Sequence, residues 1–348
     1  MIHVLVVEDS PTSRQLLVNY LNAEADIEVV GVAEDGLEAV KKVPELKPDI
    51  IVMDINMPNM NGFEATKEIM EENPTPIMLV SSEWNVDDAK TLMKGMGIGA
   101  LAALEKPRGP GHPDFRKHLE DLIEHVRVLS QIKVVRRWKQ KESNNVYKKV
   151  EAVNFRGRTY NMVVIGASTG GPSILSEILK ELPADYPLPI LVVQHMSNGF
   201  MEHFVEWLNG QCLLHVKKAV DGEIIKPGNI YFGPEGYHMT IGRGRIKFLK
   251  PVAGEMFVPS VSRLFSSAAA YGAKETVAVI LSGMGRDGAI EMKMLKDRGA
   301  LTIAQDEASS TVFGMPKEAI NLGGIDMILP PQGIKEILLK LMVAKDKR

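Results

Sequence analysis

A serine in a glycine-rich turn is the first residue of this chain whose surroundings could do chemistry. Ser168 lies within Gly166-Ala-Ser-Thr-Gly170, after the apolar run Met162 to Ile165 and before Pro172. A buried strand followed by a helix that begins near Pro172 would expose the hydroxyl beside the N–H groups of a helix start. Such groups can stabilise an oxyanion, so Ser168 is a candidate nucleophile that needs a base. Alone, the motif is ambiguous, because similar turns bind phosphates and dinucleotides.

Two further polar residues follow apolar runs that we predict to be strands. His195 comes after Pro189 to Val193, and Asp287 follows Thr276 to Ser282 within Gly-Met-Gly-Arg-Asp-Gly. Parallel strands of one sheet end at the same edge, so we expect both side chains near Ser168. His195 would take the serine proton, and Asp287 would orient the imidazole and stabilise its charged form.

The surrounding backbone completes the predicted catalytic group. N–H groups at Thr169 and Met284 are candidates for an oxyanion hole. Each residue has an ordinary alternative, since His195 could be a core histidine and Asp287 only a turn residue. Together they favour acyl transfer by serine, a reaction that needs no cofactor. The chain order Ser, His, Asp differs from that of α/β-hydrolases and predicts convergent geometry on a separate fold.

The first third of the chain carries a second group of polar residues at the ends of apolar runs. They are Glu8, Asp9, Asp54, Ser81 and Lys106. Converging carboxylates repel one another unless a hard cation lies among them, and such oxygen ligands suit Mg²⁺, which also accepts a phosphate oxygen. Asp54 could then attack a phosphoryl donor, while the lysine and the hydroxyl contact the phosphoryl group.

Alternating strand and helix patterns place these groups on two α/β domains. Five apolar strands alternate with helices over the first third, which predicts a doubly wound parallel sheet. A second alternation starts near residue 159 and is interrupted over residues 231–249 by short strands with glycine turns, a β excursion. We predict domains over residues 1–125 and 159–348, joined by a basic linker over residues 126–158. The second domain should be a doubly wound, mainly parallel α/β fold.

Length and composition agree with this organisation. A chain of 348 residues is long for one core, and 45% hydrophobic and 24% charged residues are ordinary for a globular protein. A net charge of −3 gives no general attraction to nucleic acid. The single cysteine, Cys212, fits a reducing compartment, and no signal peptide or membrane span is apparent. We therefore expect a cytoplasmic protein that neither inserts into membranes nor binds nucleic acid.

Residues 1–125 resemble the receiver domain of two-component response regulators. The matching features are Glu8-Asp9, Asp54, Met57-Pro58 with Gly62, Ser81, and Lys106-Pro107. The resemblance implies a flavodoxin-like fold with Asp54 as the phosphoacceptor. It implies that Asp9, Asp54 and the Asn56 carbonyl hold Mg²⁺, with Glu8 acting through water, and that Ser81 and Lys106 sense the phosphoryl group. Ala103 departs from the pattern, because many receivers carry an aromatic switch residue there.

Residues 160–341 resemble the catalytic domain of the chemotaxis protein-glutamate methylesterases, which are also protein-glutamine glutaminases (the CheB family). The matching segments are Ile165–Gly171, Gln194–Met196, Leu281–Ala289, Ile303–Ala308, Val312–Pro316 and Glu318–Asn321. The resemblance implies hydrolysis of γ-glutamyl methyl esters on the cytoplasmic helices of chemoreceptors, with deamidation of receptor glutamines by the same chemistry. It also implies a chemotaxis histidine kinase as the phosphodonor and an unphosphorylated receiver that covers the active-site cleft.

The chain departs from that family at Phe257-Val-Pro-Ser-Val-Ser262, where Arg-Pro-Ser-Val-Asp is usual. Val258 and Ser262 thus lack an expected cation and an expected carboxylate, which bears on substrate choice.

A different class of function remains open at this point: a non-enzymatic module in which the glycine-rich turn binds a nucleotide and the receiver controls assembly. That reading predicts a carboxylate for the ribose at the end of the next strand, where this chain has Gln194-His195 instead.

Overall fold

The computed structural model describes residues 1–81, 100–107, 109–113, 115–132, 134, 159–196, 200–252, 255 and 257–345. The chain falls into two compact units, Met1–Asn144 and Asn145–Arg348. The boundaries predicted at residues 125 and 158 stay predictions, since most of the predicted linker lies outside the described residues. In these ranges, no helix is both long enough and apolar enough to cross a membrane.

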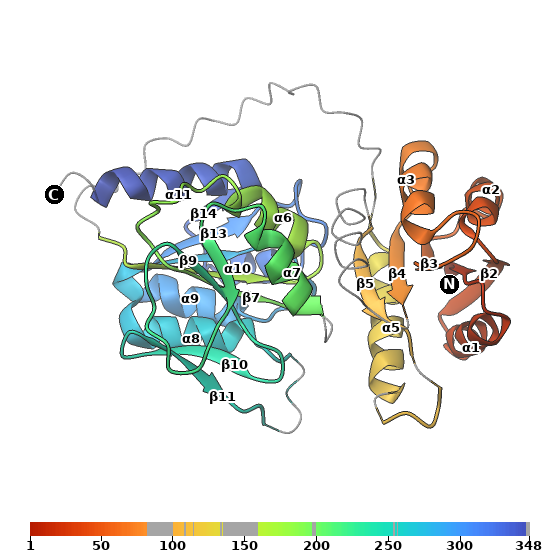
Figure 1. The fold of residues 1–348 in the computed structure, drawn as a ribbon, viewed down its shortest axis with the longest axis horizontal. Helices are drawn as coiled ribbons and strands as arrows, with labels where there is room; N and C mark the ends of the chain where they lie inside the picture. The colour runs from red at the N-terminus through yellow and green to blue at the C-terminus, as the bar shows by residue number, and fades with distance from the viewer. Residues whose placement is uncertain are drawn as a thin grey trace. The chain divides into compact units, whose positions relative to one another are not determined.

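A five-stranded parallel sheet forms the centre of the first unit (Figure 1). Its strands are β1 (Ile2–Val7), β2 (Ile27–Ala33), β3 (Ile50–Asp54), β4 (Ile77–Ser81) and β5 (Ala102–Glu105). All pairs are parallel, and the spatial order is β2-β1-β3-β4-β5. This order is the flavodoxin-like one, so the predicted fold of the first domain is confirmed.

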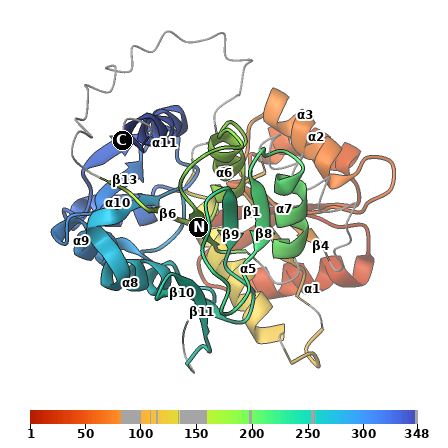
Figure 2. The same ribbon diagram turned by 60° about the vertical axis from the view of Figure 1, so that its left-hand side comes forward.

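Helices cover both faces of this sheet. They are α1 (Pro11–Asn22), α2 (Gly36–Leu46), α3 (Gly62–Glu72) and α5 (Phe115–Leu129). Figures 1 and 2 show α1 and α5 on one face and α2 and α3 on the other. The ring centroids of Tyr20 on α1 and Phe115 on α5 are 5.2 Å apart, so these two rings pack against each other between the first pair of helices.

Local capping fixes where the helices beside the acidic residues begin. The Ser10 hydroxyl accepts a hydrogen bond from the Ser13 N–H and caps α1 directly after Glu8-Asp9. Asn61 and Glu64 form a capping box at the start of α3. A Cβ atom on Gly62 would lie 2.2 Å from the Asp54 carbonyl oxygen, so this close approach of the α3 backbone to the end of β3 requires glycine.

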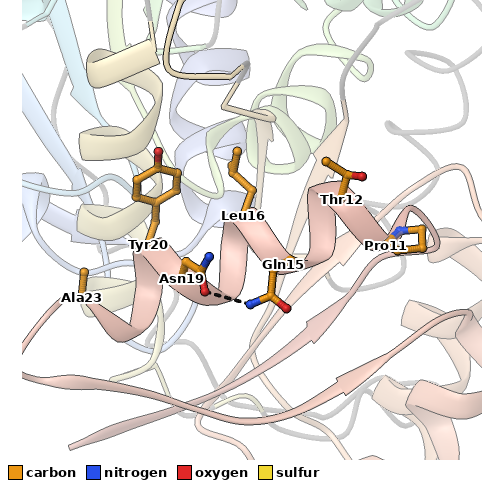
Figure 3. A pocket seen from close by; sticks show the side chains of 7 residues that line it. All are labelled: Pro11, Thr12, Gln15, Leu16, Asn19, Tyr20 and Ala23. Carbon is orange, nitrogen blue, oxygen red and sulfur yellow. Dashed lines mark hydrogen bonds between the residues drawn. The ribbon is translucent and has the colours of Figure 1, made fainter.

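An open groove of about 760 Å³ runs along α1 (Figure 3). Its lining residues are Pro11, Thr12, Gln15, Leu16, Asn19, Tyr20 and Ala23. The Gln15 side-chain amide donates a hydrogen bond to the side-chain oxygen Oδ1 of Asn19 at 2.8 Å. None of the site residues predicted from the sequence lines this groove.

A seven-stranded sheet organises the second unit. Its strands are β6 (Met162–Ala167), β7 (Ile190–Gln194), β8 (His215–Lys218), β9 (Asn229–Phe232), β12 (Thr276–Ile280), β13 (Leu301–Gln305) and β14 (Met327–Leu329). The order is β14-β13-β12-β6-β7-β9-β8, and every pair is parallel. Strands β6, β7 and β12 are fully buried, which explains their almost uninterrupted apolar sequences.

Helices again cover both faces, and a hairpin adds to one of them. The helices are α6 (Gly171–Leu179), α7 (Phe200–Asn209), α8 (Val261–Gly272), α9 (Ala289–Asp297), α10 (Met315–Asn321) and α11 (Pro331–Lys345). Figures 1 and 2 show α6 and α11 on the side opposite α8 and α9. The antiparallel hairpin of β10 (His238–Gly242) and β11 (Arg245–Leu249) packs on α8 and is the second part of the predicted β excursion. The first part was wrong, because Tyr231 and Phe232 belong to β9 and pair with β7 in the parallel sheet. The hairpin's two-residue turn, Arg243-Gly244, has positive φ at both positions, as tight hairpins require.

The strand order of the second sheet identifies where a site should form. From β6 the chain builds one side of the sheet through β7, β9 and β8, and it then crosses to the other side at β12. The order therefore reverses between β6 and β12. Ligands of open α/β sheets bind at such a reversal, beyond the carboxyl ends of the strands. Ser168 follows β6 and Asp287 follows β12.

Candidate active site and phosphoacceptor site

Ser168 lies in the turn that joins β6 to α6, and it is 8% exposed. The Ser168 N–H donates to the Ser282 carbonyl at 3.0 Å, which ties this turn to the end of β12. Gly283 packs directly against the serine, since a Cβ atom there would lie 2.7 Å from the Ser168 Cβ. Gly170 has φ +80° and carries the chain into α6. The strand, turn and helix predicted around Ser168 are confirmed.

Gln194, the last residue of β7, links the serine turn to the histidine. Its side-chain amide donates to the Ser168 carbonyl at 2.9 Å and to the His195 carbonyl at 2.6 Å. The His195 N–H also donates to the Ala167 carbonyl at 2.9 Å. Two of these hydrogen bonds join the carboxyl ends of β6 and β7, so Ser168 and His195 lie on adjacent turns.

His195 and Asp287 form the hydrogen bond predicted from the sequence. The distance from His195 Nε2 to Asp287 Oδ2 is 2.9 Å, and both side chains are largely buried. His195 Nδ1 is buried and has no hydrogen-bond partner among the described residues. The nitrogen available to take the serine proton is thus Nδ1. In the more familiar triad, the carboxylate binds Nδ1 and Nε2 is the base.

The Asp287 carboxylate receives four donors. Val261 N–H (2.7 Å) and His195 Nε2 bind Oδ2, while the Ser260 hydroxyl (3.0 Å) and the Ser262 N–H (2.9 Å) bind Oδ1. Two of these donors are the first N–H groups of α8, where the helix dipole also favours an anion. Burial alone would raise the pKa of Asp287, but His195 and Ser262 outweigh it and hold the pKa well below its usual value. Asp287 therefore stays ionised.

The two candidate oxyanion donors belong to peptides whose carbonyls are anchored. The Ser168 carbonyl, in the peptide that carries the Thr169 N–H, accepts from Gly171 N–H and Gln194. The Gly283 carbonyl, in the peptide that carries the Met284 N–H, accepts from the N–H groups of Gly314 and Met315. In the described part of the chain, neither candidate N–H donates a hydrogen bond. Because a trans peptide directs C=O and N–H to opposite sides, both donors are oriented and available.

The segment that departs from the family pattern contacts this group directly. The Phe257 ring stacks on the His195 imidazole, with centroids 4.5 Å apart and planes 3° from parallel. The Ser262 hydroxyl donates to Glu291 Oε2 at 2.7 Å and accepts from the Gly288 N–H at 2.9 Å. Serine at position 262 therefore binds the turn that carries Asp287 without adding a second carboxylate beside it.

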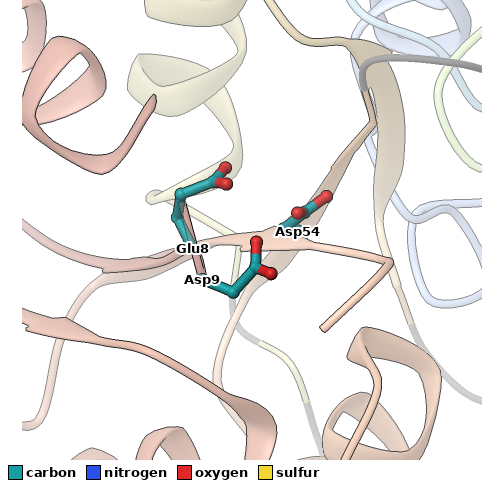
Figure 4. A group of neighbouring side chains, drawn as sticks. All are labelled: Glu8, Asp9 and Asp54. Carbon is teal, nitrogen blue, oxygen red and sulfur yellow. The ribbon is translucent and has the colours of Figure 1, made fainter. Parts of the chain in front are cut away.

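The predicted acidic cluster of the first unit is also assembled. Carboxylate oxygens of Glu8, Asp9 and Asp54 all lie within 4.8 Å of one another, and Figure 4 shows the three side chains converging. Lys106 Nζ lies 2.6 Å from Glu8 Oε2 and 3.1 Å from Asp54 Oδ2. This oxygen-rich set fits a hard cation such as Mg²⁺.

Burial is the largest influence on the pKa values of two carboxylates in this cluster. It raises the pKa of Asp54, although Lys106 opposes the shift, and it raises the pKa of Glu8 in the same way. Ser81, at the end of β4, is buried, whereas Asn56 is exposed in the loop after β3. All the residues predicted for phosphoryl chemistry thus lie at, or just after, the carboxyl ends of β1, β3, β4 and β5.

Several residues of the site were not assigned a role from the sequence. Gln194 stands within a segment that matches the family and Ser260 within the segment that departs from it, but their hydrogen-bonding roles depend on partners 26 and 27 residues away. Phe257 carries no sequence signal for stacking on a histidine. Glycine at 283 was the one available hint, because a conformationally permissive residue beside a candidate site often marks close backbone approach.

Comparison with known proteins places both units in families. The family model described as CheB methylesterase matches residues 163–338, and that of the response regulator receiver domain matches residues 4–126. The protein-glutamate methylesterase/protein-glutamine glutaminase 1 of Syntrophus aciditrophicus is 44% identical, covering 98% of each chain. The chain belongs to the CheB methylesterase family. A second member, from Nitrosospira multiformis, is 44% identical over 99% of this chain and 98% of its own length.

A solved CheB structure agrees with the fold of the second unit. The catalytic domain of Thermotoga maritima CheB methylesterase is 40% identical to this chain, with a TM-score of 0.50. The match covers 53% of this chain and 99% of that domain.

Proposed function

We propose that this chain is a phosphorylation-activated serine hydrolase that removes methyl esters from chemoreceptor glutamates and deamidates receptor glutamines in chemotactic adaptation. The observation that carries the proposal is the His195–Asp287 pair, held beside Ser168 at the strand-order reversal of a CheB-family sheet. A nucleotide-binding module is not favoured, since Gln194 occupies the predicted ribose position and its amide is engaged by backbone carbonyls.

Acylation would begin when the Ser168 hydroxyl attacks the γ-carbonyl carbon of a glutamyl methyl ester. The serine proton passes to His195 Nδ1, and the imidazolium is stabilised by the ionised Asp287. The N–H groups of Thr169 and Met284 would receive the negative charge that develops on the carbonyl oxygen. Collapse of the tetrahedral intermediate breaks the bond to the methoxy group, which takes the proton from His195 and leaves as methanol.

Deacylation repeats these steps with water as the nucleophile. His195 Nδ1 accepts a water proton, the hydroxide attacks the acyl carbon, and Ser168 leaves with the proton returned from His195. The product is a free glutamate side chain. A glutamine substrate would follow the same route, with ammonia as the first leaving group in place of methanol.

Regulation would act through Asp54 as the phosphoacceptor, with a chemotaxis histidine kinase as donor. Asp9, Asp54 and the Asn56 carbonyl would hold Mg²⁺, with Glu8 acting through water. When bound, the ion would neutralise charge between the carboxylate and the incoming phosphoryl group. Ser81 and Lys106 would contact the transferred group, which adds about −1.5 to −2 charge at neutral pH. Because the substrate segments are cytoplasmic receptor helices, we place the protein in the cytoplasm.

Methanol release from methylated receptor fragments tests the proposal. We expect release by the full chain to rise with a small phosphodonor and Mg²⁺ and to fall by at least about 10³-fold in Ser168→Ala. Ser176→Ala, on the helix that follows the site, is the matched control and should release methanol normally. Release that persists in Ser168→Ala contradicts the proposed nucleophile. Release that ignores the phosphodonor, or that EDTA leaves equally stimulated, contradicts the proposed regulation.

A further inference from the structure

His238 is a buried histidine, 1% exposed, at the start of β10. Its Nδ1 lies 3.2 Å from the Ser260 backbone nitrogen, and its Nε2 lies 2.7 Å from Glu255 Oε2. A backbone N–H can only donate, so Nδ1 must be unprotonated. The proton therefore resides on Nε2 and is donated to Glu255. The two partners together define a neutral imidazole in a single tautomer.

The Glu255 carboxylate is itself held in place. It accepts hydrogen bonds from the Arg263 guanidinium, from the Val252 N–H at 2.8 Å and from His238. These donors lower the pKa of Glu255 to about 2, so it remains an acceptor at neutral pH. The charged groups in contact with His238 and its acceptor are thus Glu255 and Arg263.

Through Nδ1, His238 is hydrogen-bonded to Ser260, the residue whose hydroxyl binds the catalytic carboxylate. Ser260 is the N-cap of α8, and its hydroxyl donates to Asp287 Oδ1 at 3.0 Å. The next two N–H groups of α8 donate to the same carboxylate. The position of Ser260 therefore sets the approach of three of the four donors to Asp287. The hydrogen bond from Ser260 N–H to His238 Nδ1 ties that position to the β10–β11 hairpin.

We propose that His238 is a positioning residue of the esterase reaction, which holds Ser260 and the start of α8 so that the Asp287 carboxylate faces His195. The inference rests on the proposed function and adds a residue that acts through Ser260, without contact with the reacting atoms. Its loss should reduce the rate of the chemical step and leave substrate binding unchanged, since Asp287 matters most when the imidazolium forms.

Two substitutions at one position separate this role from simple core packing. In His238→Asn the amide oxygen can take the place of Nδ1 and accept from Ser260, whereas in His238→Gln the longer amide reaches toward Glu255 and leaves the Ser260 N–H without its acceptor. Both remove ring volume from the same site. We expect kcat of His238→Gln to fall about tenfold, the cost of about one misplaced hydrogen bond, while His238→Asn stays within about threefold of wild type. KM should be unchanged in both.

The measurements are methanol release by the phosphodonor-activated full chain and the rate at which a fluorophosphonate labels Ser168. The exposed histidine of β8 supplies the matched control, His215→Asn. Equal kcat values in the two His238 variants, or wild-type values in both, would overturn the inference. If wild type is labelled at Ser168 but releases no methanol, the proposed substrate fails while labelling still tests His238. If wild type does neither, both proposals fall.

A spectroscopic measurement on wild type covers the case in which the variants do not fold. The ¹⁵N resonances of His238 should show an unprotonated Nδ1 and a protonated Nε2 at neutral pH. In Glu255→Gln the ring loses its charged acceptor, and kcat should fall while KM is kept. A doubly protonated His238, or the opposite tautomer, would contradict the arrangement on which the inference depends.

Discussion

Asp54 ends one buried parallel strand and Asp287 lies in the turn after another, yet the pKa of the first is raised and that of the second is lowered. Both carboxylates are nearly inaccessible, so burial alone does not separate them. The difference lies in the donors. Among the described residues, Asp287 receives four, whereas Asp54 receives the N–H of Ile55 and shares one ammonium, that of Lys106, with Glu8.

The comparison shows how the same fold position can serve two kinds of chemistry. A fully satisfied carboxylate is a permanent anion, suited to stabilising an imidazolium through a reaction cycle. A carboxylate that is short of donors remains dependent on a cation and on a bond to an incoming group, which suits a phosphoacceptor. The hydrogen-bond donors around each carboxylate, more than its burial, therefore decide its role.

Exchange of each carboxylate for an amide should give the largest contrast. We expect Asp287→Asn to lower kcat for methanol release by about 10⁴-fold, because an amide cannot orient the imidazole or stabilise its charge. Asp54→Asn should instead abolish the response to the phosphodonor. Steady-state assays of both variants with and without phosphodonor make the comparison. An Asp287→Asn enzyme that retains more than about a tenth of wild-type kcat would remove the basis for treating the two residues differently.

Removal of the shared ammonium should have the next largest effect, this time on stability. In Lys106→Met, Glu8 and Asp54 lose the cation that both contact, and the first unit should lose about 3–5 kcal/mol of stability. Lys42→Met removes a partly exposed partner of Glu38 and one hydrogen bond to the Val32 carbonyl, and it should cost about 1 kcal/mol. The protection of β1 and β3 against hydrogen exchange in the full chain measures the stability loss in both variants. Equal losses in the two variants would show that the buried cluster does not depend on Lys106.

The smallest expected effect is a pH dependence of opposite sign in the two units. A raised pKa means that folded Asp54 holds its proton to higher pH than in the unfolded chain, so the first unit loses stability as pH rises from 3.8 through the raised value. The lowered pKa of Asp287 gives stability that is complete above 3.8 and is lost as pH falls through the lowered value.

Hydrogen exchange against pH, with Asp54→Asn as reference, isolates the first contribution. Relative to that variant, protection of β1 and β3 in wild type should decrease as pH rises above 3.8, while protection of β12 and α8 stays constant. A wild-type chain that gains protection over this range would contradict the sign assigned to Asp54.

Much of this architecture was predictable because parallel α/β sheets place function at strand ends. Uninterrupted apolar runs located β1, β3, β6, β7 and β12, and the structure brings together polar residues at or after the ends of these strands. The two-unit α/β organisation was confirmed in the same way. The predicted β excursion was confirmed for the hairpin alone, since Tyr231 and Phe232 belong to the parallel sheet. Two short strands, β8 and β14, had no prediction, since a partly exposed strand of three or four residues carries too little pattern to detect.

What the sequence could not show is the set of contacts made across the sheet. The donors to Asp287 come from residues 260–262, and their approach depends on how α8 packs beside the turn after β12. The free nitrogen of His195 also depends on a side-chain rotation that no spacing encodes. The interpretation of Ser262 changed most, from a missing carboxylate to a residue that binds Glu291 and the Gly288 N–H.

Gly283 also limits how this sequence can vary. A Cβ atom there would lie 2.4 Å from the Met315 sulfur and 2.7 Å from the Ser168 Cβ. A smaller residue at position 315 would relieve the first clash, but the second involves the nucleophile itself and its backbone nitrogen at 3.2 Å. No compensating substitution at position 315 can therefore make a side chain at 283 neutral. We therefore expect no residue other than glycine to be tolerated at position 283 while Ser168 occupies this turn.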